Sequence, residues 1–261
     1  MSETRLHPRH LEWEGLINAR DSGGLTAAGG VVREGALVRS DVLNDLTPNG
    51  VEALIEHGVR TVIDVRSANE ISHAWERYPL REHDLVEYRN LPFRAPRDEA
   101  AAAAVRAAWD GAQSREDYNR IDLDHNGPGM TAILGAIADA PPGGVLIHCH
   151  AGKDRTGMVI ALALSAVGVS DEDIADDYAL TQLVLEEIMT EWFQSLGVTD
   201  DSEKERLWNL SVPSREAMLD TLAYLRERYG GAERYLLDAG MTQDQMARLR
   251  ARLVDAKEGA A

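Results

Sequence analysis

The sequence predicts an α/β protein with a mostly parallel central sheet flanked by helices, an N-terminal β-hairpin and a helical C-terminal part. Three patterns lead to this prediction. Short apolar runs typical of buried strands alternate with helix-like segments between residues 47 and 167. Paired glycines divide residues 21–40 into short β-branched runs. Beyond residue 170, apolar residues recur only at helical spacing.

The first elements follow from turn and cap residues. Residues 21–40, DSGGLTAAGGVVREGALVRS, predict two strands joined by tight turns. Thr47 can cap a helix that has a proline at its first position. Gly58 ends that helix. RTVIDV, over 60–65, predicts a strand that ends in polar Asp64.

The middle of the chain continues the alternation. Residues 85–91 predict a less well patterned strand, and the alanine-rich segment 96–111 favours helix on propensity alone. The polar, glycine-bearing stretch 114–130 predicts a loop. PPGGVLIHC, residues 141–149, predicts a turn and a short buried strand, and 154–167 predicts a helix. This order implies parallel strands with helices on the faces of the sheet.

The C-terminal part predicts helices only. Thr242 and Gln245 have the spacing of a capping box ahead of an apolar helical stripe. Another stripe is formed by Met218, Leu222, Leu225 and Tyr229. No repeat or linker marks a domain boundary, so we expect 1–261 to form a single domain.

Composition excludes several classes of function. The 261 residues include 44 acidic and 27 basic side chains, a formal net charge of −17, so the field of the molecule repels nucleic acid and anionic membranes. The longest apolar run, 158–169, is too short to cross a bilayer, and no signal peptide is recognisable. A single cysteine excludes an internal disulfide and suits a reducing compartment. We expect a cytoplasmic protein with no nucleic-acid partner, no stable membrane insertion and no cofactor; export without a signal peptide stays open.

One stretch contains the candidate catalytic and anion-binding residues: HCHAGKDRTG, residues 148–157. It joins a predicted strand to a predicted helix, and open α/β sheets bind ligands at this end of their strands. Backbone N–H groups at the start of a helix have no helical partner and can hold an anion. Gly152 and Gly157 permit the turn, and the planar fork of Arg155 can grip two phosphoryl oxygens.

Cys149 in this loop is predicted to be a nucleophile. The same amides and helix end would stabilise a thiolate at neutral pH. It would attack phosphorus and form a phosphocysteine that water hydrolyses, with a neighbouring acid protonating the leaving oxygen and then activating the water. A buried, inert cysteine is the alternative. The residues expected to bind the phosphoryl group are His150, Ala151, Gly152, Lys153, Thr156 and Gly157.

A metal site built from His148, Cys149 and His150 is another alternative. On a strand the histidines would face one side and the cysteine the other, and no second ligand pair such as Cys-x-x-Cys is present. We therefore predict no metal and expect His148 to order the loop by hydrogen bonding.

The loop resembles the His-Cys-x-x-Gly-x-x-Arg-Thr-Gly signature of the cysteine-dependent protein tyrosine phosphatase superfamily. Within it, the sequence is similar to the bacterial tyrosine-protein phosphatases of the type secreted by pathogenic mycobacteria. The similarity extends over 18–24, 35–47, 58–70 and 229–241, and so covers most of the chain. It implies a protein tyrosine phosphatase-like fold. It also implies a phosphorylated protein or a phosphoinositide as partner, and hydrolysis of phosphotyrosine, phosphoserine, phosphothreonine or phosphoinositide.

Carried over position by position, the resemblance makes Cys149 the nucleophile and Arg155 the phosphate clamp. Lys153 would add charge for a second phosphate, or else be a solvated residue at a helix start. Thr156 would donate a hydrogen bond to the cysteine sulfur when the sulfur becomes the leaving group. It would also serve as the hydroxyl at the start of the helix.

Two residues are candidates for the general acid, because the Trp-Pro-Asp loop of the classical enzymes is missing. Asp154 lies inside the loop, and Asp64 ends a strand of the same sheet; we favour Asp154. Either could instead form a salt bridge that orients Arg155. Arg20 and Asp21, in NARD, match a motif near the family's site, and we expect a structural role there, with Asp21 buttressing a turn.

The resemblance also implies a helical lid at about 180–212. LTQLVLEEIMTEWF, 180–193, is apolar on more than one face, which indicates either burial between helices or a lid that excludes water and protects Cys149 from oxidation. Two rival functions are open. One is a pseudophosphatase that binds phosphorylated partners without turnover, and the other is a rhodanese-type sulfurtransferase.

Overall fold

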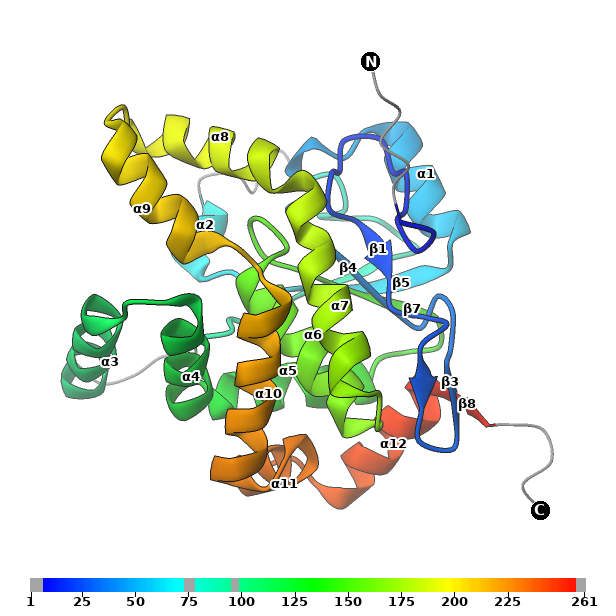
Figure 1. Ribbon diagram of the computed structural model, residues 1–261. Helices are drawn as coiled ribbons and strands as arrows, with labels where there is room; N and C mark the ends of the chain where they lie inside the picture. The colour runs from blue at the N-terminus through cyan, green and yellow to red at the C-terminus, as the bar shows by residue number, and fades with distance from the viewer. Residues whose placement is uncertain (1–6, 73–77, 95–98, 257–261) are drawn as a thin grey trace.

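A five-stranded sheet forms the centre of the computed structural model, which describes residues 7–72, 78–94 and 99–256 (Figure 1). Its strands, in spatial order, are β1 (Arg20–Asp21), β4 (Leu37–Ser40), β7 (Gly144–His148), β5 (Val59–Asp64) and β6 (Glu87–Asn90). Only β1 is antiparallel to its neighbour. The predicted mostly parallel sheet is confirmed.

Apolar side chains point to both faces of the sheet, so both faces are covered. Neighbouring residues such as Val62 and Ile63 belong to different core clusters. The cluster of Val62 includes α1 (Pro48–Glu56), whereas that of Ile63 includes α5 (Gly127–Ala138) and α6 (Asp154–Ala166). Two layers therefore pack on one sheet, as the fold class requires.

The predicted caps are present where they were expected. The Thr47 hydroxyl accepts a hydrogen bond from the Gly50 amide at the start of α1. The helix ends just before Gly58, whose φ of +97° favours glycine. Thr242 and Gln245 form the capping box of α12 (Gln243–Leu253).

The N-terminal hairpin is present but is smaller than predicted. It consists of β2 (Thr26–Ala27) and β3 (Gly30–Val32), while the two flanking strands of this region join the central sheet. A further strand, β8 (Val254–Ala256), pairs with β3. The expectation of helices only in the C-terminal part is wrong at β8, because three residues carry no strand periodicity and pairing alone defines the strand.

The prediction of a loop at 114–130 is wrong. The segment contains α4 (Arg115–His125) and the start of α5 at Gly127. The Ser114 side chain caps α4, and Leu123 is buried in the larger core cluster. A good cap and tertiary packing thus outweigh the low helix propensity of the segment.

The other helices complete the layers. They are α2 (Ala68–Ser72), α3 (Glu99–Gly111), α7 (Asp171–Ala179), α8 (Leu185–Leu196), α9 (Asp201–Ser211), α10 (Arg215–Tyr229) and α11 (Ala232–Asp238), with short 3-10 helices at Leu43–Asp45 and Leu180–Val184. Residues 96–98 of the predicted helix 96–111 lie outside the described residues. None of the described helices is both long and apolar enough to cross a membrane.

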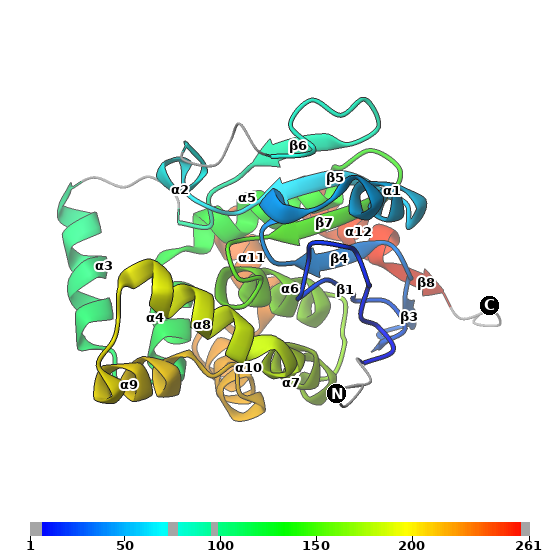
Figure 2. The same ribbon diagram turned by 90° about the horizontal axis from the view of Figure 1, so that it is seen from above.

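The carboxyl ends of three parallel strands meet at one edge of the sheet. His148 at the end of β7 lies opposite Ser40 of β4 and Asp64 of β5 in the register. In Figure 2 the arrowheads of β5 and β7 point toward the side on which α2, α4, α8 and α9 lie. The loop that carries Cys149 starts at this edge.

Candidate active site

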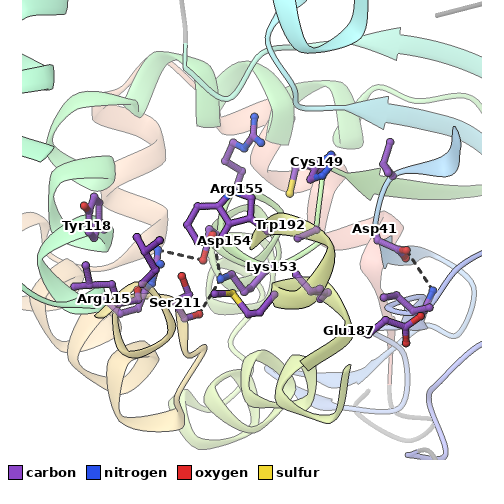
Figure 3. A pocket seen from close by; sticks show the side chains of 18 of the residues that line it. Asp41, Arg115, Tyr118, Cys149, Lys153, Asp154, Arg155, Glu187, Trp192 and Ser211 are labelled. Atoms are coloured by element: carbon purple, nitrogen blue, oxygen red, sulfur yellow. Dashed lines mark hydrogen bonds and ion pairs between the residues drawn. The ribbon is translucent and has the colours of Figure 1, made fainter. Parts of the chain in front are cut away.

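The loop between β7 and α6 lines a cavity of about 850 Å³ (Figure 3), called here the Cys149 cavity. Six predicted site residues line it: Cys149, His150, Ala151, Lys153, Asp154 and Arg155. Three others are buried in the loop or at the start of α6: Gly152, Thr156 and Gly157. Cys149 itself is only 3% exposed. The structure thus gathers the predicted loop residues at one place.

Two glycines allow the loop to pack tightly. Gly152 has φ +64°, and a Cβ there would lie 2.3 Å from the carbonyl oxygen of Ser40 in β4. A Cβ on Gly157 would lie 2.7 Å from the Tyr178 ring, so this glycine serves close packing of α6 against α7. Substitution at Gly152 would therefore break the turn, while substitution at Gly157 would push α7 away.

His148 orders the loop, as its position at the strand end predicts. Its Nδ1 lies 3.0 Å from the Cys149 carbonyl oxygen, and its Nε2 lies 2.8 Å from the Tyr78 hydroxyl. Burial lowers the pKa of His148, so the ring is neutral at physiological pH. Both ring nitrogens are already engaged with protein groups.

Arg155 is held by a carboxylate that the sequence analysis did not single out. Its two Nη atoms each lie 2.8 Å from an oxygen of Glu70 in α2. Burial alone would raise the pKa of Glu70, but Arg155 and the bonds from Ser67 lower it to about 2. The sequence signal for Glu70 is its capping-box spacing with Ser67, which marks the start of α2 but does not indicate the contact with Arg155.

Asp154 faces the cavity among cations. Its side chain is 36% exposed, and its carboxylate lies 3.1 Å from Arg115 Nη1 and 3.7 Å from Lys153 Nζ. Burial raises the pKa of Asp154, but Arg115 and Lys153 outweigh it and leave the pKa below its ordinary value. Asp154 is therefore an ionised carboxylate at neutral pH.

The same two cations bind the end of α9. Lys153 Nζ donates to the Ser211 carbonyl at 2.8 Å, and Arg115 Nη2 donates to the Leu210 carbonyl at 2.5 Å. Both side chains are largely buried, and Lys153 is 5% exposed. The lysine is therefore not solvated; it links the loop to α9.

Asp64 lies apart from the Cys149 cavity. It is fully buried, and its carboxylate accepts hydrogen bonds from Arg66 Nε and Nη2 and from the Tyr88 hydroxyl. Burial opposes ionisation, but the hydrogen bonds and the positive charge of Arg66 hold the pKa of Asp64 below its usual value. Asp64 is not among the residues that line the cavity.

Asp122 is a further acid of the cavity, and it falls in the segment predicted to be a loop. It is 5% exposed and accepts a hydrogen bond from Asn126 Nδ2 at 2.8 Å, with Arg94 Nη2 at 3.7 Å. Burial raises the pKa of Asp122 to about 6, which Arg94 only partly opposes. The i, i+4 spacing of Asp122 and Asn126 would have indicated the pair once the segment was recognised as helical.

Asp122→Asn should stabilise the protein at pH 8 by up to about 3 kcal/mol. A carboxyl with a raised folded-state pKa lowers stability when it is ionised, so the gain is largest above pH 6 and disappears below about pH 4. Asparagine keeps the acceptor for Asn126. Urea denaturation of both proteins at pH 8 and pH 4.5 measures this, and equal gains at the two pH values would contradict it.

Helices α8 and α9 form the outer wall of the Cys149 cavity. Ile188, Met189 and Trp192 of α8 and Leu207 and Leu210 of α9 line it. Figure 3 shows Trp192, Cys149 and Asp154 around the cavity. The segment expected as a lid therefore lies over the loop.

Arg20 and Asp21 make structural contacts. The Asp21 carboxylate accepts hydrogen bonds from the amides of Gly23 and Gly35 and lies 2.8 Å from His57 Nε2. Arg20 Nη2 donates to the Asp177 carbonyl at 2.9 Å. Asp21 thus buttresses turns.

A parallel α/β sheet with a cysteine and an arginine on one anion-binding loop at a helix start defines the class of cysteine-containing phosphatases. Comparison with known proteins agrees. The chain belongs to the tyrosine phosphatase family, whose sequence model matches residues 11–255. It is a protein-tyrosine-phosphatase.

Two relatives span most of the chain. It is 28% identical over 222 residues to the tyrosine-protein phosphatase of Nostoc commune, covering 84% of this chain and 74% of the relative. It is 28% identical over 275 aligned residues to the triple specificity protein phosphatase PtpB of Mycobacterium tuberculosis, covering 92% and 97% respectively.

Proposed function

We propose that residues 1–261 act as a single catalytic domain that hydrolyses phosphotyrosine through a phosphocysteine on Cys149. The observation that carries the proposal is the placement of Cys149, Asp154 and Arg155 on one loop facing one cavity at the start of α6. The helix start favours both a thiolate and a phosphoryl dianion.

The chemistry divides into two displacements. Cys149 Sγ bonds to phosphorus as the ester P–O bond breaks, and Asp154, in the fraction of molecules in which its carboxyl is protonated, gives its proton to the leaving oxygen. Asp154 then takes a proton from water, whose oxygen attacks phosphorus and breaks the S–P bond. Inorganic phosphate and the free thiolate result. The buried Thr156 hydroxyl, which has no hydrogen-bond partner among the described residues, would donate to the departing sulfur.

Arg155 can bind Glu70 and a phosphoryl group together. A guanidinium carries five N–H donors, and Glu70 takes one from each Nη atom. The edge formed by Nε and one Nη keeps two parallel donors for two phosphoryl oxygens. We therefore assign Glu70 the task of holding the plane of the clamp in place.

The lining of the cavity favours an aromatic phosphoester. Apolar side chains suited to a tyrosyl ring are Leu16, Ile17, Val42, Ile188, Met189 and Trp192. Acidic Asp45 and Glu187 also line the cavity and oppose a polyanionic ligand, and the cations Arg115 and Lys153 of the lining are already paired with Asp154. Phosphoserine, phosphothreonine and phosphoinositides follow as weaker substrates, and the name of the mycobacterial relative supports breadth of this kind.

A substrate panel tests the proposal. The kcat/KM of the wild-type protein should be at least about tenfold higher for a phosphotyrosine peptide than for the matching phosphoserine peptide or a soluble phosphoinositide. Faster turnover of the phosphoinositide would contradict the substrate assignment. Thiosulfate turnover would favour the sulfurtransferase, and binding of the phosphopeptide without turnover would favour the pseudophosphatase.

We also propose that the segment at about 180–212, with α8 and α9, acts as a lid that protects Cys149. Trp192→Ala should then speed inactivation by peroxide severalfold, because the thiolate becomes accessible. Phe193→Ala is a matched control: Phe193 stacks on Trp192 at 5.9 Å but does not line the cavity. Equal inactivation rates for wild type and Trp192→Ala would count against the lid.

A further inference from the structure

Three successive carbonyl groups of the loop are held from outside the cavity. They belong to His150, Ala151 and Gly152, and their donors are Val42 N at 2.8 Å, Asn18 Nδ2 at 2.9 Å and Arg39 Nη2 at 2.9 Å. Two of the donors are side chains that lie more than a hundred residues from the loop in the sequence. Each carbonyl of the turn therefore has a fixed direction.

The two side-chain donors are themselves fixed. Asn18 is 3% exposed, and its Oδ1 accepts a hydrogen bond from Arg20 Nη1 at 2.6 Å. Arg39 is 0% exposed, and its Nη1 lies 2.8 Å from Asp177 Oδ2. Neither can turn away without leaving buried polar groups unpaired, which costs more than the bond itself is worth.

Peptide geometry converts these bonds into a direction for the amides. In a planar trans peptide the C=O and the following N–H point in opposite directions. When a carbonyl points toward β4 and the N-terminal segment, the N–H of the next residue therefore points to the opposite side of the loop. The amides concerned are those of Ala151, Gly152 and Lys153, and none of them donates to a backbone carbonyl within the described ranges. They are free to bind phosphoryl oxygens.

We propose that Asn18 and Arg39 are positioning residues for the phosphate-binding loop, setting the direction of the amides that hold the phosphoryl group. The inference rests on the proposed phosphatase function, because only an anion in the loop uses those amides. Asn18 acts on the peptide that contains the Gly152 amide, and Arg39 acts on the next one. Neither residue lines the Cys149 cavity, so each acts through the loop.

Asn18→Ala tests the proposal, with Thr181→Val as its matched control. Thr181 Oγ1 accepts from Arg20 at 3.1 Å and lies 3.4 Å from Asn18 Oδ1, so its loss disturbs the same buried network without touching the loop. In Asn18→Ala the affinity for inorganic phosphate, measured by calorimetry, should fall at least about tenfold, since the Gly152 amide is no longer held in position and loses its hydrogen bond to the charged phosphate. The acidic limb of the kcat/KM profile should move to higher pH. Thr181→Val should show neither change.

The outcomes separate positioning from simple support. If both variants lose a similar amount of thermal stability and Asn18→Ala binds phosphate like the wild type, the network is only structural and the proposal is overturned. Arg39→Lys is the second variant should Asn18→Ala fail to fold, with the same expected loss of phosphate affinity. Phosphate binding does not depend on turnover, so an inactive wild type would refute the proposed function and still leave this measurement decisive.

Discussion

Cys149→Ser is expected to have no measurable turnover of a phosphotyrosine peptide, a loss of at least about 10⁴-fold in kcat. Serine places a hydroxyl where the reaction needs a thiolate. A hydroxyl at the same site stays protonated, and the adjacent His148 cannot act as its base because both ring nitrogens are engaged. Steady-state assay of the purified variant measures the loss.

Binding provides the control for this variant. The loop amides and Arg155 remain, so the variant should still bind inorganic phosphate and should trap a phosphotyrosine peptide. Mass spectrometry of acid-quenched wild type should find one phosphoryl group on Cys149 and none on the variant. Residual turnover above about 1% of wild type would refute covalent catalysis by this sulfur.

The second large effect is expected from Asp154→Asn, which should lower kcat by about 10² to 10⁴-fold on esters with poor leaving groups. A leaving group that needs no proton should be affected much less. A series of aryl phosphates with increasing leaving-group pKa measures this, because the slope of log kcat against that pKa becomes steeper when the acid is lost.

Asp64→Asn distinguishes the two candidate acids. Asp64 is buried against Arg66, so its replacement should lower stability and leave the leaving-group slope at the wild-type value. The pH profile gives a second test. Asp154 must be protonated for the first step and its pKa lies below the ordinary value, so kcat/KM should fall as pH rises through that pKa. The Asp154→Asn variant should lack this fall.

Regular elements were predictable where the pattern is local. The strand at β7, the helix at α6 and the caps at Thr47 and Thr242 depend on neighbours in the sequence, and they are found as predicted. Helix α4 was missed because its polar sequence has low helix propensity and its cap at Ser114 and packing partners decide the outcome. Strand β8 was missed because its only signal is a partner more than two hundred residues away.

The site residues likewise fall into those that the local sequence predicts and those that it does not. Residues adjacent to Cys149 could be assigned from the sequence because a turn between a strand and a helix brings them together. Glu70 and Asp122 enter the site from other elements, and nothing local reports their distance to the loop. The roles of Asn18 and Arg39 depend on which way a carbonyl points, which only coordinates reveal.

The buried guanidinium groups have a consequence for how substrate arrives. Arg9, Arg20 and Arg39 converge on the single carboxylate of Asp177, which leaves positive charge uncompensated beneath the loop in a chain of net charge −17. An incoming dianion is repelled at long range by the net charge and attracted at short range by these guanidinium groups. Salt screens exposed charges beyond about 10 Å at 0.1 M but screens buried ones much less. Added salt screens the long-range repulsion first, so capture should accelerate with ionic strength, the reverse of an enzyme whose whole surface steers its ligand inward.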